Sequence, residues 1–264
     1  TDSQRGDGYF ARTMAGYEIA KHHGLDVRFI CTFTNQSVRE REKIVRFFME
    51  RGFPLKLHPA LPSLRSDEPD FWALPPEEYG ELLVYLLDAA LAYPDDLEIL
   101  NILDLCRCVF TRRGSVCTFA DCMGNTFAIG PDGNIYPCYR FVGMDEWSMG
   151  SVHECPGTDE MARTSAWKRM EEFRNHVDES CSSCPHIKYC RGGCPYNALA
   201  GRSPGETGVD PHCTAYARIF TEISDRMNAE LYDTPQVSAG PFGRRNQETK
   251  KNGVMNLVHR LVMK

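Results

Sequence analysis

Residues Cys181–Pro195 read CSSCPHIKYCRGGCP, which places four cysteines within fourteen residues. Their spacing is Cys-x2-Cys-x5-Cys-x3-Cys, and four thiolates carried on short turns can close around one compact metal centre. Gly192 and Gly193 lie just before the last cysteine, where the lack of side chains lets the backbone pass close to such a centre. We interpret this stretch as a metal-binding segment.

Four further cysteines extend the pattern. Cys117 and Cys122 are separated by four residues. Cys138 follows a turn signal, and Cys213 opens a helical pattern. Together with the first quartet they make eight candidate ligands, enough for two fully ligated 4Fe–4S clusters. Two zinc sites of four thiolates each are the alternative, although zinc sites typically pair two short Cys-x2–4-Cys knuckles and the gaps of five and three residues fit that poorly.

The composition is that of an ordinary globular protein with one large domain or two modest ones: 264 residues, 42% of them hydrophobic and 25% charged. A formal charge of −6 argues against a nucleic-acid partner, which would require a basic face. Neither a membrane-spanning apolar run nor a signal peptide is visible, so we expect a cytoplasmic protein without a membrane partner. In that setting, 12 cysteines point to metal ligands before disulfides.

The first hundred residues alternate helical and strand patterns. Ser37 and Glu40 have the spacing of a capping box, and Pro76 suits the first turn of a long helix. The predicted elements are helices at 10–23, at 37–52 and from 76, with strands at 27–33 and 55–57. This alternation predicts an α/β fold with a parallel sheet.

The amino-acid composition changes after about residue 106, where Gly, Pro and Cys become frequent. Residues 130–134 form a strong turn signal between two apolar pairs and predict a β-hairpin. Helices are predicted over 158–176 and after Cys213, followed by a polar linker at 233–252 and a short amphipathic tail. We therefore expect three parts, at 1–105, 106–232 and 233–264.

The complete pattern is Cys117-x4-Cys122-x15-Cys138, then the quartet, then eighteen residues and Cys213. It resembles the SPASM domain, which follows the barrel of radical S-adenosylmethionine enzymes that mature peptides, including anaerobic sulfatase-maturating enzymes. The text around the cysteines agrees as well: DGNIYPC ending at 138, GSV at 150–152 and RGGC ending at 194. Residues 1–100 resemble the later half of the radical S-adenosylmethionine barrel, with 27–33 and 54–61 as its fifth and sixth strands.

The resemblance implies two auxiliary 4Fe–4S clusters with interleaved ligands. The first set of implied ligands is Cys117, Cys122, Cys138 and Cys194. The second set is Cys181, Cys184, Cys190 and Cys213. The resemblance also implies a peptide or protein substrate, a flavodoxin- or ferredoxin-like reductant and, only in the full-length enzyme, S-adenosylmethionine with a third 4Fe–4S cluster.

Two residues at the end of the sixth strand of that barrel are candidates for the active site. Leu61 would face the adenine of S-adenosylmethionine, with a plain core leucine as the alternative. His58 would line the active site, with a solvated strand-end histidine as the alternative.

The CxxxCxxC motif that defines the radical enzymes is absent from these 264 residues, as are the first three βα units of the barrel. We therefore expect the C-terminal part of a longer enzyme: a partial barrel followed by a cysteine-rich α+β domain, inactive by itself. The intact enzyme would modify a ribosomally made peptide or protein by hydrogen abstraction. A stand-alone iron–sulfur electron carrier, a peptide-binding module and a zinc-stabilised binding domain are the alternatives.

Tyr139 directly follows the hairpin cysteine. In sulfatase-maturating relatives an Asp at this place serves as the catalytic base, whereas a phenol with a pKa near 10 is a poor base at neutral pH. Formylglycine formation is therefore disfavoured relative to another peptide modification. Tyr139 is expected to position substrate or pass a proton, with packing over the cluster as the alternative.

The remaining cysteines have no place in this pattern. Cys31 and Cys106 are expected to be small buried hydrophobes. Cys108 and Cys155 are expected to be inert, with a substitute ligand or a disulfide partner as the alternative.

Overall fold

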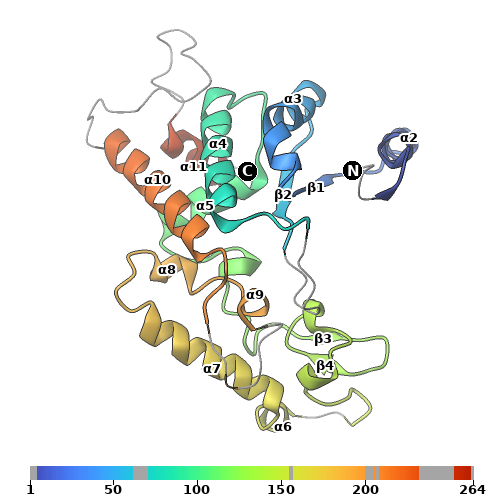
Figure 1. Cartoon of the computed structure of the whole chain (residues 1–264), viewed down its shortest axis with the longest axis vertical. Helices are drawn as coiled ribbons and strands as arrows, with labels where there is room; N and C mark the ends of the chain where they lie inside the picture. Colours follow the sequence, from blue (N-terminus) through green and yellow to red (C-terminus); the bar gives the residue numbers. More distant parts are fainter. Residues whose placement is uncertain are drawn as a thin grey trace.

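The computed structural model describes residues 5–61, 71–154, 157–199, 205, 208–231 and 253–262. The first two strands and the long helices beside them lie toward one end, and a cysteine-rich lobe with the β-hairpin and a further long helix lies toward the other (Figure 1). The elements in chain order are α2 (Tyr9–His22), β1 (Phe29–Phe33), η1 (Ser37–Glu40), α3 (Arg41–Arg51), β2 (Leu55–Pro59), α4 (Pro76–Ala92), α5 (Leu100–Thr111), η2 (Cys117–Phe119), β3 (Ala128–Ile129), β4 (Ile135–Tyr136), η3 (Tyr139–Phe141), η4 (Asp145–Trp147), α6 (Thr158–Met161), α7 (Ser165–Ser180), α8 (Ile187–Cys190), α9 (Pro195–Leu199), α10 (Cys213–Leu231) and α11 (Val254–Val262).

β1 and β2 form a parallel pair in which Phe29 lies opposite Leu55 and Phe33 opposite Pro59. Leu55 and Leu57 are fully buried, as expected for a strand covered by helices. Leu55 also forms an isolated parallel bridge to Ile99, just before α5. This mixed arrangement of helices and parallel strands agrees with the predicted α/β class.

α4 and α10 cross closely and contribute much of the main core (Figure 1). A Cβ added at Gly80 of α4 would lie 3.3 Å from the Ala215 Cα and 3.3 Å from the Arg218 Cδ on α10. Arg226 of α10 pairs with Asp88 of α4 at 2.7 Å, and both side chains are largely buried. α10 therefore fixes the cysteine-rich lobe to the strand-bearing end of the chain.

α11 packs on α5 and α10 with Val254 and Leu257 buried. The carboxylate of Glu230 accepts hydrogen bonds from the backbone N–H groups of Val254 at 2.6 Å and Met255 at 3.0 Å, which caps the start of the helix. The predicted amphipathic tail is thus a docked helix. The linker predicted at 233–252 lies outside the described residues.

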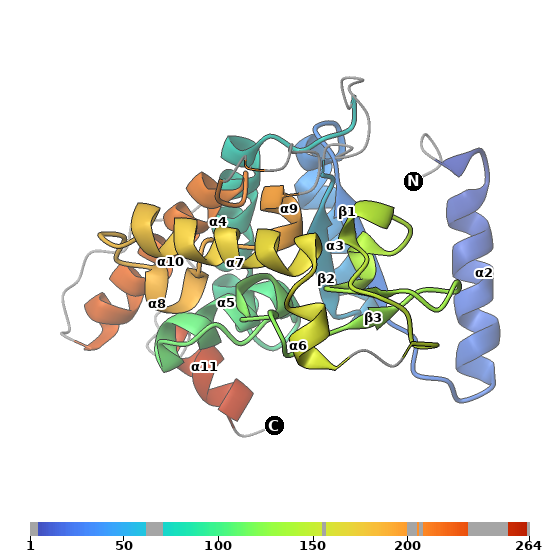
Figure 2. The ribbon, with the colours of Figure 1, turned by 90° about the horizontal axis from the view of Figure 1, so that it is seen from below.

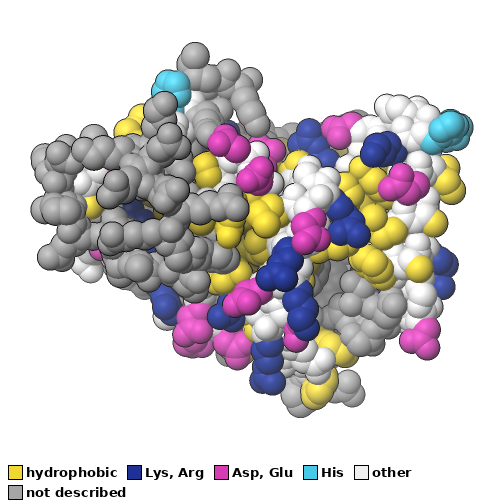
Figure 3. All heavy atoms as spheres, turned by 90° about the horizontal axis from the view of Figure 1, so that it is seen from above, with side chains coloured by type: hydrophobic (Ala, Val, Ile, Leu, Met, Phe, Trp, Pro, Cys, Tyr) yellow, Lys and Arg dark blue, Asp and Glu magenta, His cyan; other side chains and the backbone are white. Residues whose placement is uncertain are grey.

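α2 lies to one side of the other elements and buries none of its residues (Figures 1 and 2). Phe10 and Ile19 on this helix and Ile30 on β1 are exposed hydrophobic side chains. Hydrophobic side chains gather toward the same side in the view from above (Figure 3). No helix in the described part of the chain is both long and apolar enough to cross a bilayer.

The cysteine-rich lobe has its own core around the predicted hairpin, in which Ala128 of β3 lies opposite Tyr136 of β4. Tyr136, Phe141 and Trp147 are fully buried there. The rings of Phe141 and Trp147 stack with their centroids 4.1 Å apart. α7 covers this core with one apolar face, so the lobe is held by packing as well as by its turns.

Two predicted helix boundaries are wrong. The Ser37 hydroxyl accepts the Thr34 N–H at 2.8 Å instead of capping a helix, so residues 37–40 form the 3-10 helix η1 and α3 begins at Arg41. The helix predicted over 158–176 is divided into α6 and α7, because the Thr164 hydroxyl caps a new start by accepting the Trp167 N–H at 3.3 Å.

The close crossing of α4 and α10 can be tested at Gly80. We expect Gly80→Leu to lower the free energy of unfolding by about 1–3 kcal/mol, since its side chain must push α10 aside. Gly16→Leu in α2 is the matched control, because a Cβ there meets no described atom within 4 Å. Urea denaturation of both variants measures the difference, and equal stability of the two would contradict the close crossing.

Candidate metal centre

The first implied ligand group comes from three segments that are distant in sequence. Cys117 begins η2 and is exposed, whereas Cys122 follows in a half-buried loop. Cys138 directly precedes η3, and Cys194 directly precedes α9. All four thiols are free of disulfides.

These four thiols act on one another electrostatically. Burial raises the pKa of Cys122 to about 11, and Cys194, Cys117 and Cys138 contribute to the rise in that order. Burial also raises the pKa of Cys138, and Cys117 adds to it. Because a thiolate is disfavoured by another negative charge nearby, these shifts place the four sulfurs in one neighbourhood.

The second implied group surrounds the junction of α7, α8 and α10. Cys181 follows the end of α7 and Cys184 lies in the next turn. Cys190 ends α8 and is buried, and Cys213 is the first residue of α10 and exposed. These thiols are also free of disulfides.

The same mutual effect joins this group. Burial raises the pKa of Cys181, with further contributions from Cys213 and Cys184. Burial raises the pKa of Cys190 to about 12, and Cys213 and Cys184 again add to it. The structure thus brings the eight candidate thiols into two groups of four, while the assignment of each group to a cluster stays a prediction.

The described residues contain no group of three or more His, Cys, Asp or Glu side chains arranged to bind a single metal ion. The thiols lie near one another on turns, but among the described residues they do not enclose a site for one metal ion. Thiolates are the ligands that iron–sulfur clusters require, and they also suit zinc. The donor set therefore fits the implied clusters and leaves the zinc alternative to experiment.

The turn between Cys190 and Cys194 explains the two adjacent glycines. Arg191, Gly192 and Gly193 all have positive φ, at 54°, 78° and 82°. A Cβ at Gly192 would collide with the Val177 side chain on α7, and one at Gly193 would collide with Asp210. The glycines are thus required by neighbouring protein atoms, a constraint that the sequence alone did not reveal.

Asp210 is a buried residue that the sequence analysis missed. Its carboxylate accepts the Cys194 N–H at 2.9 Å, the Asn197 side-chain amide at 2.8 Å and the His212 N–H at 2.9 Å. The Nδ1 of His212 lies 3.2 Å from Oδ1 of Asp210, the oxygen that also accepts the His212 N–H. An acid three residues before Cys213 was the available signal, but its partners are brought in only by the fold.

Arg140 is a second residue that the sequence analysis missed. Its backbone N–H donates to the Cys138 Sγ at 3.4 Å, and its Nη1 lies 3.9 Å from the Cys194 Sγ. The same Nη1 donates to the Asn197 side-chain oxygen at 2.8 Å, and the guanidinium lies 3.9 Å from the centre of the Tyr196 ring. Arg140 therefore connects two thiols of the first group.

Comparison with known proteins finds a family model that matches part of this lobe. Residues 117–185 match the model of SPASM, an iron–sulfur cluster-binding domain. The resemblance that the cysteine spacing indicated is thereby confirmed.

Curated relatives extend the similarity beyond the SPASM domain. The chain is 24% identical over 225 residues to the cysteine-type anaerobic sulfatase-maturating enzyme of Clostridium perfringens, covering 83% of this chain and 60% of that protein. It is 59% identical over 113 residues to an uncharacterized protein of Methanothermobacter thermautotrophicus, covering 43% of each. The chain therefore spans about half the length of the curated relatives that it matches.

Solved structures agree in fold. The tagged anSMEcpe with bound AdoMet aligns with a TM-score of 0.68 at 19% identity, covering 85% of this chain and 59% of that one. The native anSMEcpe with bound AdoMet and Cp18Cys peptide aligns with a TM-score of 0.67 at 19% identity, covering 86% of this chain and 63% of that one. At this level of identity the alignments establish a shared fold.

The remaining candidates lie at the edge of the SPASM domain and at the end of β2. Tyr139 begins η3 with 70% of its surface exposed. His58 is the fourth residue of β2, and partial burial together with the positive charges of Lys56 and Arg140 lowers its pKa. The effect of Arg140 places the end of β2 near the first thiol group. Leu61 follows that strand and is half-buried.

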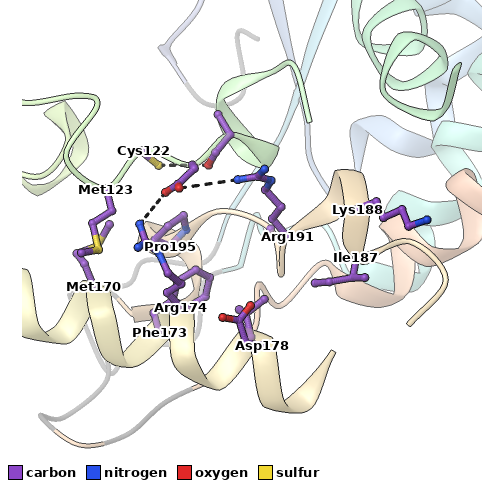
Figure 4. Close-up of a pocket in the computed structure, with 14 residues that line it drawn as sticks. Cys122, Met123, Met170, Phe173, Arg174, Asp178, Ile187, Lys188, Arg191 and Pro195 are labelled. Atoms are coloured by element: carbon purple, nitrogen blue, oxygen red, sulfur yellow. Dashed lines mark hydrogen bonds and ion pairs between the residues drawn. The ribbon is translucent and has the colours of Figure 1, made fainter. Parts of the chain in front are cut away.

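A pocket of about 340 Å³ opens beside Cys122 on the surface of the SPASM domain (Figure 4). Met170 and Phe173 of α7 form part of its wall. Asp121 on its rim pairs with Arg174 at 3.0 Å and Arg191 at 3.9 Å. The pocket was not predicted, because its two walls are more than forty residues apart in sequence.

Three of the other cysteines lie away from the two groups. Burial raises the pKa of Cys31 to about 11 and that of Cys106 to about 12. Cys106 and Cys108 are fully buried, and the Cys108 Sγ lies 3.4 Å from the Ser115 hydroxyl. Cys31 is half-buried. Cys155 lies outside the described residues.

The steric role of Gly193 can be tested against Gly143, which has nearly the same φ of 80° but no described atom within 4 Å of an added Cβ. Either substitution by Ala costs about 1–2 kcal/mol for the left-handed backbone. We expect Gly193→Ala to lose about 1–3 kcal/mol more, because its methyl group meets Asp210. Urea denaturation of the metal-free chain measures both, and equal losses would refute the steric role.

Proposed function

We propose that this chain is the auxiliary-cluster part of a radical S-adenosylmethionine maturase, which modifies a ribosomally made peptide or protein by hydrogen abstraction. The observation that carries the proposal is the grouping of eight free thiols into two sets of four, one of them centred on Cys122 and the other on Cys190. The match of residues 117–185 to SPASM and the similarity to sulfatase-maturating enzymes over 83% of the chain support it.

Each set would hold one auxiliary 4Fe–4S cluster, the first through Cys117, Cys122, Cys138 and Cys194, the second through Cys181, Cys184, Cys190 and Cys213. Bound there, the clusters would supply one-electron transfer or an anchoring point for the substrate. The chain's own residues carry the ligands on short turns and surround them with fixed N–H donors. The Arg140 N–H at the Cys138 sulfur is one of these donors.

The division into parts is also a proposal. Residues 1–105 would form the later half of the barrel, with β1 and β2 as its fifth and sixth strands, and residues 106–232 the SPASM domain. The parallel pairing of β1 with β2 supports this division. S-adenosylmethionine, the third cluster and a role for Leu61 beside the adenine would belong to the full-length enzyme.

A peptide or protein is the proposed substrate. Solved structures of anSMEcpe, which share the fold of this chain, contain bound peptides. Tyr139 would contribute to binding, because it is largely exposed at the exit of the hairpin, directly after a proposed ligand. A phenol in place of a carboxylate favours a modification other than formylglycine formation. A flavodoxin- or ferredoxin-like protein would supply electrons.

The ligand sets can be tested by metal analysis. Anaerobically purified chain is expected to contain about eight irons and eight sulfides, with 4Fe–4S signals in electron paramagnetic resonance after reduction. Cys138→Ala and Cys213→Ala should each lower the iron content to about four, since each removes a ligand of a different cluster. Cys31→Ala is the control and should keep all eight, and Tyr139→Phe should do the same.

The same measurement separates the alternatives. About two zinc ions per chain, in strictly anaerobic and iron-replete protein, would replace the redox role with a structural binding module. If the chain binds the full eight irons but its gene has no CxxxCxxC-coding segment upstream, the result would instead favour an electron carrier. Full occupancy together with such a segment is the result that the maturase requires.

A further inference from the structure

A buried chain of hydrogen bonds connects the two thiol groups. It starts at Arg140, whose Nη1 is 3.9 Å from the Cys194 Sγ and donates to the Asn197 oxygen at 2.8 Å. The Asn197 amide nitrogen then donates to Asp210 at 2.8 Å. Asp210 also accepts the backbone N–H of His212 at 2.9 Å, and the His212 Nδ1 lies 3.2 Å from the same oxygen. His212 directly precedes Cys213. One end of the chain thus touches the first group, and the other end reaches the second.

The oxygens of Asp210 are enclosed by nitrogen atoms. They accept the Cys194 N–H, the Asn197 side-chain amide and the His212 N–H, and the His212 Nδ1 lies 3.2 Å from the oxygen that accepts the His212 N–H. The residue is 1% exposed, so little water screens its charge. Burial is the main cause of the raised pKa of Cys190 and Cys213, and the charge of Asp210 adds to both shifts.

Arg140 acts on the first group alone. Its charge lowers the pKa of Cys138 and Cys194, against the larger effect of burial. At Cys194 it also opposes Asp210. The charged side chains that shift the pKa of Cys190 and Cys213 most are all negative, so the second group has no such compensation.

We propose that Arg140 raises the reduction potential of the first auxiliary cluster above that of the second, with Asn197 and Asp210 holding its side chain in place. The inference rests on the proposed function, since it needs both clusters. A cluster gains one negative charge on reduction, so a fixed cation favours the reduced form and a fixed anion opposes it. Both effects are enlarged by burial.

The proposed order of the two reduction potentials can be related to where each cluster would lie in the molecule. Arg140 also acts on His58, at the end of β2. The cluster that is reduced more easily would therefore be the one on the side of the proposed barrel mouth. Arg140 is a positioning residue, because it acts through the Cys194 thiolate that it contacts.

The test is an anaerobic redox titration of the iron-loaded chain followed by electron paramagnetic resonance. Arg140→Gln should lower the higher midpoint potential and leave the lower one unchanged. Arg140→Lys, which keeps the positive charge, should restore most of the difference. Asp210→Asn should raise both midpoints, because the carboxylate accepts the Cys194 N–H and its charge also acts on Cys190 and Cys213.

Matched controls remove exposed charges from α6 and α7. Lys168→Gln and Asp159→Asn change the net charge by the same amounts, and both side chains are exposed. Both variants should leave the two midpoints in place. If a purely structural role explained Arg140, the Lys variant would behave like the Gln variant.

The outcomes separate this inference from the proposed function. If the chain binds about eight irons but its midpoint potentials do not change in Arg140→Gln, the inference is overturned, while the proposal of two clusters remains supported. A chain that binds no iron overturns both. Should Asp210→Asn fail to fold, the comparison of the Gln and Lys variants at Arg140 still decides the matter, because neither alters the buried carboxylate.

Discussion

The buried carboxylate of Asp210 fixes the relative placement of the segments that carry the two ligand groups. It accepts the N–H of Cys194 from the loop before α9 and the N–H of His212 from the residue just before α10, and the His212 Nδ1 lies 3.2 Å away. It also occupies the space that a side chain at Gly193 would need. A carboxylate at 1% exposure is costly unless its oxygens are paired, and here three N–H donors together with the nearby His212 Nδ1 meet that requirement.

α10 extends this constraint into the rest of the molecule. Its first residue is Cys213, and its later turns pack along α4, where Arg226 pairs with Asp88. Tyr216 in the first turns lies against both Tyr79 of α4 and Phe119 of η2, with ring centroids 6.2 and 4.9 Å apart. α10 thus carries a proposed ligand at its first residue and packs in the main core along its length. A shift of α10 would therefore move both the ligand and the core contacts.

The sequence predicted what depends on local pattern and missed what depends on distant partners. The hairpin at Gly130–Asn134, the helix from Pro76 and the helix after Cys213 were all predicted, because turn residues, a first-turn proline and an apolar stripe act within a few residues. Ser37 bonded to Thr34 rather than to its own helix, which no spacing rule anticipates. Asp210 and Arg140 were missed because the contact of each with Asn197 spans 13 and 57 residues of sequence, respectively.

The thiol pKa values connect folding to metal loading. Burial and mutual repulsion raise the pKa of Cys122 to about 11 and that of Cys190 to about 12, so both are neutral thiols at neutral pH without a metal. Cluster ligation requires thiolates, and binding must therefore release these protons. The iron–thiolate bonds must supply the free energy of this proton release. The apolar cores and the Asp210 hydrogen bonds hold the ligand-bearing segments in place. The turn through Gly192 and Gly193, fixed by its contacts with Val177 and Asp210, restricts the backbone between Cys190 and Cys194 and so reduces the conformational entropy that ordering these ligands costs.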